Sequence, residues 1–407
     1  MKDRSPSEFD VSALGASLLI ACLAGCGGSG GAIGPSQTQG TYAYLASAAA
    51  QGQDAAGAIY QYRVNSDGSL TPLSTSSIAT GVGPTSIAAV PTGRYVYVAN
   101  ATDGTLSQYA VGAQGALNPL SPPVLEVGGP FPLAGYSLSI DPDGSFLYAV
   151  IRPRDPPGPV GAIAQFSIGS DGTLSPLSPA IVSVPGLVAG PLVVDSKGLH
   201  AYLAANGAAG GMVFQYSIGA DGALAPLAPE SVAAAQNSVA VALHPNGEAA
   251  YVLSTCIDAA CEGQAALYTI GATGALSSTG TATLIGAHVA PIGLLIDPSG
   301  SAAYLLANFM GVDTNTGAIY EYAVDASGAL VPDTPPSVGV QSGSVAEAIV
   351  GAQLYALSAN AVGMASGSPS GGYVTRYAFG TGGELSEISS ISLSASLPTS
   401  MTFATTH

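Results

Sequence analysis

A unit of about fifty residues repeats seven times along the 407-residue chain, and no other feature limits the possible folds as much. Each unit has an apolar strand with a tyrosine, at positions 44, 97, 148, 202, 251, 304 and 355. The spacings are 53, 51, 54, 49, 53 and 51 residues. A second aromatic strand and a Gly-x-Leu turn follow each tyrosine. Three markers that each occur seven times indicate seven copies of one structural unit.

A fourth apolar strand, ending in a tight turn, precedes the tyrosine strand in most units. Examples are residues 86–93 (SIAAVPTG) and 293–300 (GLLIDPSG). Four short strands within about 50 residues are typical of one blade of a β-propeller. The sequence therefore predicts an all-β chain, a single seven-bladed β-propeller over residues 41–407, with four antiparallel strands per blade.

The two ends of the chain are predicted to share one blade. The first unit begins at its second strand, because only a Gly-rich segment precedes Tyr44. Residues 398–403 (PTSMTF) resemble residues 84–89 (PTSIAA), the innermost strand of the second unit. We expect the C-terminal strand to join the N-terminal blade as its innermost strand, which pairs an otherwise open sheet edge.

The first forty residues indicate export. Lys2 and Arg4 precede an apolar run over residues 11–24. Fourteen helical residues span about 21 Å, which is too short for a bilayer core of about 30 Å and typical of a signal peptide. The segment Leu23-Ala24-Gly25-Cys26 resembles the bacterial lipobox, in which the cysteine becomes the lipidated first residue of the mature protein. The alternative is an ordinary secretory peptide with an incidental cysteine.

These features divide the chain into a lipoprotein signal peptide (1–25), a flexible Gly/Ser-rich tether (26–40) and the propeller (41–407). We expect a monomer in the bacterial cell envelope, periplasmic or surface-exposed, that contacts the membrane only through a lipid on Cys26. Charged residues make up 8% of the chain, with 8 Lys and Arg against 25 Asp and Glu. This balance argues against nucleic acid as a partner, because binding phosphates requires a basic face.

One family resemblance follows from the repeat. The segment Tyr97-Val98-Ala99-Asn100, with residues 91–93 (PTG) before it and 104–106 (GTL) after it, resembles the repeat of YVTN-type, lactonase-like seven-bladed β-propellers. That family includes propeller-type 6-phosphogluconolactonases. The resemblance covers residues 41–407 and implies the propeller fold, with hydrolysis of a sugar lactone as one expected activity.

Variable loops are predicted to gather on one face of the ring. The turns between first and second strands and between third and fourth strands are short and alike. The connections between second and third strands are longer and variable, as in residues 152–161, 254–263 and 360–372. We call the face formed by these connections the long-loop face. Variable loops on a rigid scaffold commonly bind ligands, so we expect a pocket at the channel mouth there.

Three residues on the long-loop face are weak candidates for catalysis. His288 precedes an innermost strand, and its imidazole could act as a general base, although an ordinary loop histidine is the simpler interpretation. Arg152 and Arg154 lie together in the loop of the third blade, where they could bind a carboxylate or phosphate or could merely be solvated. None of the three matches a motif of the catalytic lactonases.

Cys256 and Cys261 lie in another long loop, and in an exported protein two cysteines this close are expected to form a disulfide. A metal site there is less favoured, because no histidine lies nearby in sequence. The Asp-Gly turns, such as Asp67-Gly68 and Asp171-Gly172, could suggest calcium. However, equivalent turns carry Gln114 or Thr273, which are poor replacements for a carboxylate ligand. We therefore expect neither a metal nor a cofactor.

Two functions remain open at this point. The favoured one is a non-catalytic module that binds a small molecule, a carbohydrate or an envelope protein on the long-loop face. The alternative, implied by the family resemblance, is a carboxylic ester hydrolase that opens a sugar lactone. That chemistry needs a base to activate water and a donor to stabilise the oxyanion. Only His288, Arg152 and Arg154 offer such groups.

Overall fold

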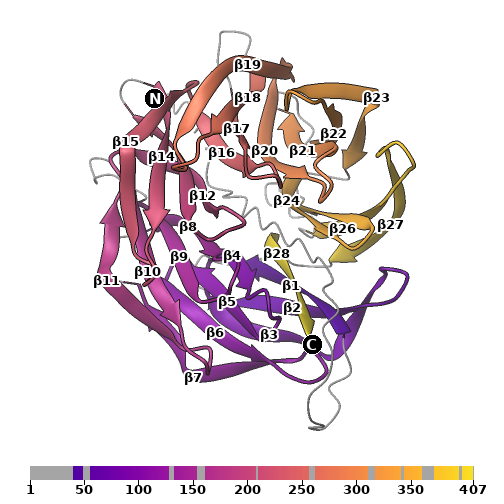
Figure 1. Ribbon diagram of the computed structural model, residues 1–407. Helices are drawn as coiled ribbons and strands as arrows, with labels where there is room; N and C mark the ends of the chain where they lie inside the picture. Colours follow the sequence, from indigo (N-terminus) through magenta and orange to yellow (C-terminus); the bar gives the residue numbers. More distant parts are fainter. Residues whose placement is uncertain are drawn as a thin grey trace, which may run out of the picture.

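Seven four-stranded antiparallel sheets form a closed ring in the computed structural model (Figure 1). The structure describes residues 40–48, 56–127, 133–153, 161–207, 210–255, 262–309, 317–340, 343–359, 371–393 and 397–406. Every regular element in these residues is a strand. None of them forms a helix that is long and apolar enough to cross a membrane. The predicted all-β, seven-bladed propeller is confirmed.

The blades follow one another in chain order, and each is given from its innermost to its outermost strand. Blade 1 consists of β28 (Leu397–Thr406), β1 (Gly40–Ala48), β2 (Ala56–Val64) and β3 (Leu70–Val82). Blade 2 consists of β4 (Pro84–Ala89), β5 (Tyr95–Asn100), β6 (Thr105–Val111) and β7 (Leu117–Glu126). Blade 3 consists of β8 (Leu133–Ile140), β9 (Phe146–Pro153), β10 (Ala162–Ile168) and β11 (Leu174–Ser183). Blade 4 consists of β12 (Leu187–Val194), β13 (His200–Gly207), β14 (Gly210–Ile218) and β15 (Leu224–Ala234). Blade 5 consists of β16 (Ser238–Leu243), β17 (Ala249–Ser254), β18 (Glu262–Ile270) and β19 (Leu276–Ala287). Blade 6 consists of β20 (Val289–Ile296), β21 (Ala302–Phe309), β22 (Gly317–Val324) and β23 (Leu330–Val340). Blade 7 consists of β24 (Gly343–Val350), β25 (Gln353–Ala359), β26 (Gly372–Phe379) and β27 (Leu385–Leu393).

The C-terminal strand closes the ring as predicted. Strand β28 pairs antiparallel with β1, with Thr402 opposite Tyr44, so the last strand of the chain is the innermost strand of blade 1. Figure 1 shows the yellow β28 beside the indigo strands of the N-terminal blade. The innermost strands of neighbouring blades contact each other all the way around the ring.

Burial follows the position of a strand in its blade. The second strand of each blade is buried on both faces, as in β1 and β5, because its side chains alternate between the two neighbouring blades. The outermost strands, such as β7, are exposed along most of their length. Strands that are buried on both faces read as continuous runs of apolar residues, which explains why the repeats contain few charges.

A buried tyrosine joins each blade to the next. The hydroxyl of the second-strand tyrosine donates a hydrogen bond to a glycine carbonyl in the third-to-fourth-strand turn of the following blade, at 2.6–2.8 Å. The seven donors and acceptors are Tyr44 to Gly115, Tyr97 to Gly172, Tyr148 to Gly222, Tyr202 to Gly274, Tyr251 to Gly328, Tyr304 to Gly383 and Tyr355 to Gly68. The last bond, from blade 7 to blade 1, completes the circle.

In most blades, the residue opposite the tyrosine on the third strand forms a second link between blades. In four blades it is a buried glutamine whose Oε1 accepts the backbone N–H of a leucine in the next blade, at 2.5–2.8 Å. Its Nε2 donates to a carbonyl in the outermost strand of its own blade, at 2.8–3.1 Å. These glutamines are Gln61, Gln108, Gln165 and Gln215. One amide therefore satisfies a donor of the next blade and an acceptor of its own blade.

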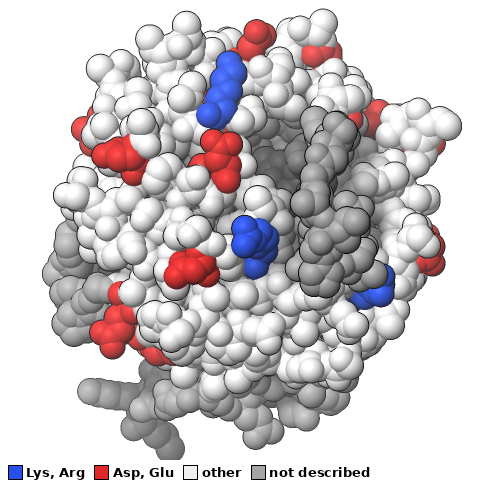
Figure 2. Space-filling view, turned by 60° about the horizontal axis from the view of Figure 1, so that its bottom comes forward, with Lys and Arg blue, Asp and Glu red and all other residues white. Residues whose placement is uncertain are grey.

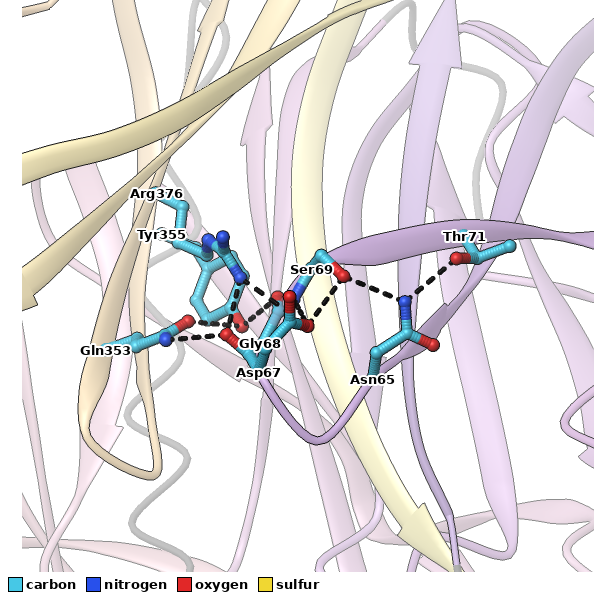
Figure 3. Close-up of polar contacts among 8 residues, drawn as sticks. All are labelled: Asn65, Asp67, Gly68, Ser69, Thr71, Gln353, Tyr355 and Arg376. Atoms are coloured by element: carbon cyan, nitrogen blue, oxygen red, sulfur yellow. Dashed lines mark hydrogen bonds and ion pairs between the residues drawn. The ribbon is translucent and has the colours of Figure 1, made fainter.

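The contact between blades 7 and 1 replaces this glutamine with an arginine (Figure 3). Nη1 of Arg376 donates to the carbonyl of Asp67 at 2.6 Å, and Nε2 of Gln353 donates to the same carbonyl at 2.9 Å. The Asp67 carboxylate accepts hydrogen bonds from the backbone and side chain of Ser69, and these bonds lower its pKa. The β2–β3 turn of blade 1 is thus fixed by three side chains of blade 7, with Tyr355 as the third.

The tyrosine link predicts a difference between two buried tyrosines of blade 4. Tyr202→Phe leaves the buried carbonyl of Gly274 without its donor, so we expect the free energy of unfolding to fall by about 1–3 kcal/mol. The Tyr216 hydroxyl is buried and finds no hydrogen-bond partner among the described residues, so Tyr216→Phe should be neutral or stabilising. Denaturant unfolding of both variants measures the difference, and equal losses would contradict the assigned role of the hydroxyl.

Candidate functional site

The face opposite the long-loop face consists of hairpin turns that are tightly packed against the next blade. Nδ1 of His200 lies 2.9 Å from the Asp195 carboxylate, and the imidazole covers Gly274 of blade 5. Phe146 covers Gly222 in the same way, one blade earlier. Nε2 of His244 lies 3.0 Å from the carbonyl of Gly300 in blade 6. Both histidines therefore fill packing positions between blades.

These turns offer no metal site in the part of the chain that the structure describes. Among those residues, no group of three or more His, Cys, Asp or Glu side chains could hold an ion. The turn carboxylates instead accept hydrogen bonds from their own turns. Asp171 binds the backbone and side chain of Thr173, and Asp141 binds the backbone N–H groups of Ser145 and Phe146. Turn chemistry accounts for these aspartates.

On the long-loop face, the structure describes mainly the ends of the strands. The loops at 49–55, 154–160, 256–261, 310–316 and 360–370 lie outside the described residues. The innermost strands begin beside the ends of the second strands, as the pairing of Ala290 with Asn308 and of Gly135 with Arg152 shows. The candidate site is therefore the mouth of the channel, framed by these strand ends.

Two asparagines fix the starts of innermost strands at this mouth. The Asn308 side chain, at the end of β21, accepts the Ser344 N–H at 2.6 Å and donates to the Ser344 carbonyl at 3.1 Å. Asn206, at the end of β13, binds Ser238 in the same two ways, both at 2.9 Å. Each side-chain amide therefore makes one accepting and one donating hydrogen bond to the backbone of the next blade, as a paired strand would. The two asparagines are 36 and 32 positions from the serines they bind, so the local sequence does not indicate this contact between blades.

Close packing leaves room for only small residues beside these serines. A Cβ on Gly317 would overlap the Ser344 hydroxyl, and a Cβ on Gly211 would overlap both the Ser238 hydroxyl and the Ala235 carbonyl. Asn100 acts differently, because its amide accepts from the Thr80 hydroxyl of the preceding blade and donates to the Ser107 hydroxyl of its own blade. Asn360, which follows the tyrosine strand of blade 7 in the sequence, lies outside the described residues. The mouth is therefore rigid where the strands meet.

His288 occupies the single-residue connection between β19 and β20. Its side chain is exposed, and its backbone is left-handed with φ of 59°. Asn237 and Gly83 hold the corresponding positions before blades 5 and 2 with φ of 55° and 65°. Histidine and asparagine adopt this conformation more readily than most residues. The left-handed backbone at His288 is therefore explained by the short connection between the strands. Its exposed imidazole can contact solvent or a ligand.

Arg152 lies near the end of β9 in blade 3 and is half-buried. His288 leads into blade 6, so the topology puts both residues on the long-loop face but in sectors that are not adjacent. Arg154, Cys256, Cys261 and Cys26 lie outside the described residues, as do the signal peptide and all of the tether except Gly40. Chemically, the mouth can supply an imidazole as a proton acceptor and a guanidinium as an anion partner.

Charge is spread thinly over the surface. Figure 2 shows isolated acidic and basic side chains scattered across a face that is mostly uncharged. This fits a chain with only 33 Lys, Arg, Asp and Glu residues in 407, taking 8 basic and 25 acidic ones together. Acidic side chains outnumber basic ones on the face shown, but neither sign forms a continuous patch among the described residues.

Two buried carboxyl groups escaped the sequence analysis. Glu321 stands where other blades have the linking glutamine, and Glu347 stands in an innermost strand at an apolar position. Burial is the main cause that raises the pKa of each carboxyl group. Aligning the seven repeats column by column would have identified both residues, because each departs from the other blades at its position.

Comparisons with known proteins agree with this architecture. Residues 37–135 match the family described as "Lactonase, 7-bladed beta-propeller". No curated protein matches the chain. The periplasmic gluconolactonase PpgL of Pseudomonas aeruginosa is 19% identical, with a TM-score of 0.65 over 90% of this chain and 99% of that one. A putative 6-phosphogluconolactonase of Bacteroides uniformis is 15% identical, with a TM-score of 0.66 over 90% and 100%. The predicted resemblance to lactonase-like propellers is confirmed, and these structures show a shared fold.

The asparagine contact predicts a stability change at the mouth. Asn308→Ala leaves the N–H and carbonyl groups of Ser344 without partners, so we expect the free energy of unfolding to fall by about 1–3 kcal/mol. Asn118→Ala, in an exposed part of β7, should change it by less than about 0.5 kcal/mol. Thermal and denaturant unfolding compare the two. A loss at Asn118 as large as that at Asn308 would refute the assignment.

Proposed function

We propose that this chain, a lactonase-like seven-bladed β-propeller, binds a small carbohydrate-type ligand at the channel mouth on its long-loop face. The observation that carries the proposal is the difference between the two faces. One face is made of turns whose polar groups are used in packing, as at His200 and His244. The other presents the exposed imidazole of His288 and the strand ends that lead into the variable loops. Ligands of ring-shaped folds commonly bind at such mouths.

Hydrolysis of a sugar lactone is the second candidate. It is supported by the family match over residues 37–135 and by the likeness to a periplasmic gluconolactonase. In this reaction a base takes a proton from water, and the resulting hydroxide attacks the lactone carbonyl. The ring C–O bond then breaks to give a hydroxy acid. His288 would serve as the base, and Arg152 would stabilise the oxyanion or bind the carboxylate product.

We favour ligand binding over lactone hydrolysis because of where Arg152 and His288 lie. Arg152 belongs to blade 3, and His288 leads into blade 6. A base and an oxyanion donor must both reach the same carbonyl carbon, within hydrogen-bond distance of the reacting atoms. A ligand that spans the mouth can contact both residues without this restriction. Arg154, two positions further along the chain and outside the described residues, is the remaining candidate for a second contact.

The ligand proposal is tested by calorimetry on the mature protein with gluconolactone, gluconate and a panel of neutral sugars. We expect Arg152→Ala to weaken binding by about tenfold or more, since a hydrogen bond to a charged group contributes about 1.5–3 kcal/mol. His200→Phe, which restores the residue type found at Phe146, is the matched control and should bind normally. Unchanged binding by the Arg152 variant would contradict the proposed site.

The same panel of lactones, followed in a pH-stat, separates the two functions. Turnover above buffer that His288→Ala abolishes, while binding remains, would establish the hydrolase and its base. Binding without turnover would support the binding function and contradict the hydrolase. If no compound of the panel binds or reacts, both small-molecule proposals fail, and an envelope protein becomes the expected partner.

We further propose that the protein is exported and carries a lipid on Cys26. The lipobox-like segment before Cys26 and the Gly-rich tether after it support this location. The description of PpgL as periplasmic agrees with it. In cells grown with labelled palmitate, the full chain should be labelled and recovered with membranes, whereas Cys26→Ser should be neither. An unlabelled full chain would instead support an ordinary secretory peptide.

A further inference from the structure

Glu321 imitates a linking glutamine only when it carries a proton. It lies opposite Tyr304, as the linking glutamines lie opposite their own tyrosines. Its Oε2 accepts the Leu385 N–H of blade 7 at 2.6 Å, which reproduces one of the two glutamine bonds. Its Oε1 is buried and has no partner among the described residues. The glutamines donate from this position to their outermost strand, and a carboxyl group can donate only in its protonated form.

Glu347 replaces a large apolar side chain in the innermost strand of blade 7. It pairs with Ala356, and the six residues at the same register position in other blades are all buried. These are Ile87, Leu138, Leu192, Val241, Leu294 and Met401. Glu347 is 2% exposed, and neither of its carboxyl oxygens has a hydrogen-bond partner among the described residues. An ionised carboxylate is strongly disfavoured in such surroundings.

Both carboxyl groups belong to the interface between blades 6 and 7. Glu321 extends from blade 6 to Leu385 of blade 7. Glu347 extends from blade 7 toward the backbone of Leu306 in blade 6, which lowers its pKa but does not offset the effect of burial. Between them lies an apolar cluster of the two blades that includes Ile319 and Leu354. No other interface between blades contains two buried carboxyl groups among the described residues.

The groups that face these carboxyls do not neutralise them. Asp333 of β23 and Glu384 of the β26–β27 turn act on Glu321, and both raise its pKa beyond the effect of burial. The hydroxyls of Tyr304 and Tyr377, which belong to the same cluster, donate to the carbonyls of Gly383 and Gly339. No basic side chain in the described residues is among the groups that act on either carboxyl. Protonation is therefore the way in which this interface avoids buried negative charge.

We propose that the interface between blades 6 and 7 is a pH-sensitive seam, closed while Glu321 and Glu347 are protonated and opened by their ionisation. Opening exposes both carboxyls to water and frees β24 from blade 6. Because Ser344, near the start of β24, is held by Asn308 of blade 6, opening also changes the channel mouth. The seam is a property of the ring itself and holds whether or not the proposed ligand binds there.

The direction of the effect follows from proton linkage. A carboxyl group whose pKa is higher in the closed state than in the open state holds its proton more tightly when the seam is closed. The stabilisation is complete below the pKa of the open state and is lost as the pH rises through the pKa of the closed state. Between these values, each carboxyl increases the opening equilibrium constant by up to about tenfold per pH unit.

Hydrogen exchange of the full chain between pH 5 and pH 9, corrected for intrinsic exchange rates, tests the seam. We expect protection of β20–β25 to fall as the pH rises, by up to about tenfold per unit for each carboxyl that ionises, while protection of β9–β14 stays constant. Glu321→Gln and Glu347→Leu install the residue types found in other blades, so both variants should fold. Combined, they should abolish the pH dependence of β20–β25.

Glu126→Gln removes an exposed carboxyl in blade 2 and is the matched control, expected to retain the full pH dependence. Thermal unfolding provides a second measurement. The double variant should raise the midpoint more at pH 8 than at pH 5. A pH response that is uniform around the ring, or that persists in the double variant, overturns the proposal. So does a double variant whose gain in midpoint is equal at both pH values.

Discussion

Neighbouring blades of this ring are joined by a hydrogen bond from a tyrosine hydroxyl on one sheet to a backbone carbonyl in a turn of the next sheet. The tyrosine bond occurs at all seven interfaces, with donor–acceptor distances of 2.6–2.8 Å. It joins neighbouring blades in the same way all around the ring. The glycine in each of these turns has a positive φ, which glycine adopts without a steric penalty. At Gly115, for example, φ is 80° and a Cβ would overlap the ring of Tyr42.

The period of the sequence was sufficient to predict the number of blades, the strands of each blade and the closure by β28. Turn chemistry also predicted that the Asp-Gly turns are structural. What the sequence did not reveal were contacts between blades, because these depend on curvature that no single repeat encodes. Asn206, for example, binds Ser238, thirty-two residues further along the chain. Glu347 could be recognised only from its register, which places it where the other blades have apolar side chains.

The candidate site was less predictable than the fold for a related reason. Its face was predicted from loop lengths, but its chemistry depends on side chains contributed by different blades. Arg152 and His288 are separated by 136 positions, taking 288 minus 152, and belong to different sectors of the ring. The scaffold around them is rigid, since the strand starts are fixed by asparagine amides. Function in such a ring can change by substitution in the loops while the interfaces between blades remain constant.

The pairing of β1 with β28 joins residues that are 366 positions apart, such as Gly40 and Thr406. During synthesis, the N-terminal blade therefore has one edge of β1 unpaired until β28 has been made. Contacts this distant in sequence form late in folding. An interrupted chain keeps that edge exposed, and an unpaired edge attracts other strands. The state of this one edge therefore distinguishes a chain that lacks β28 from one that has closed its ring.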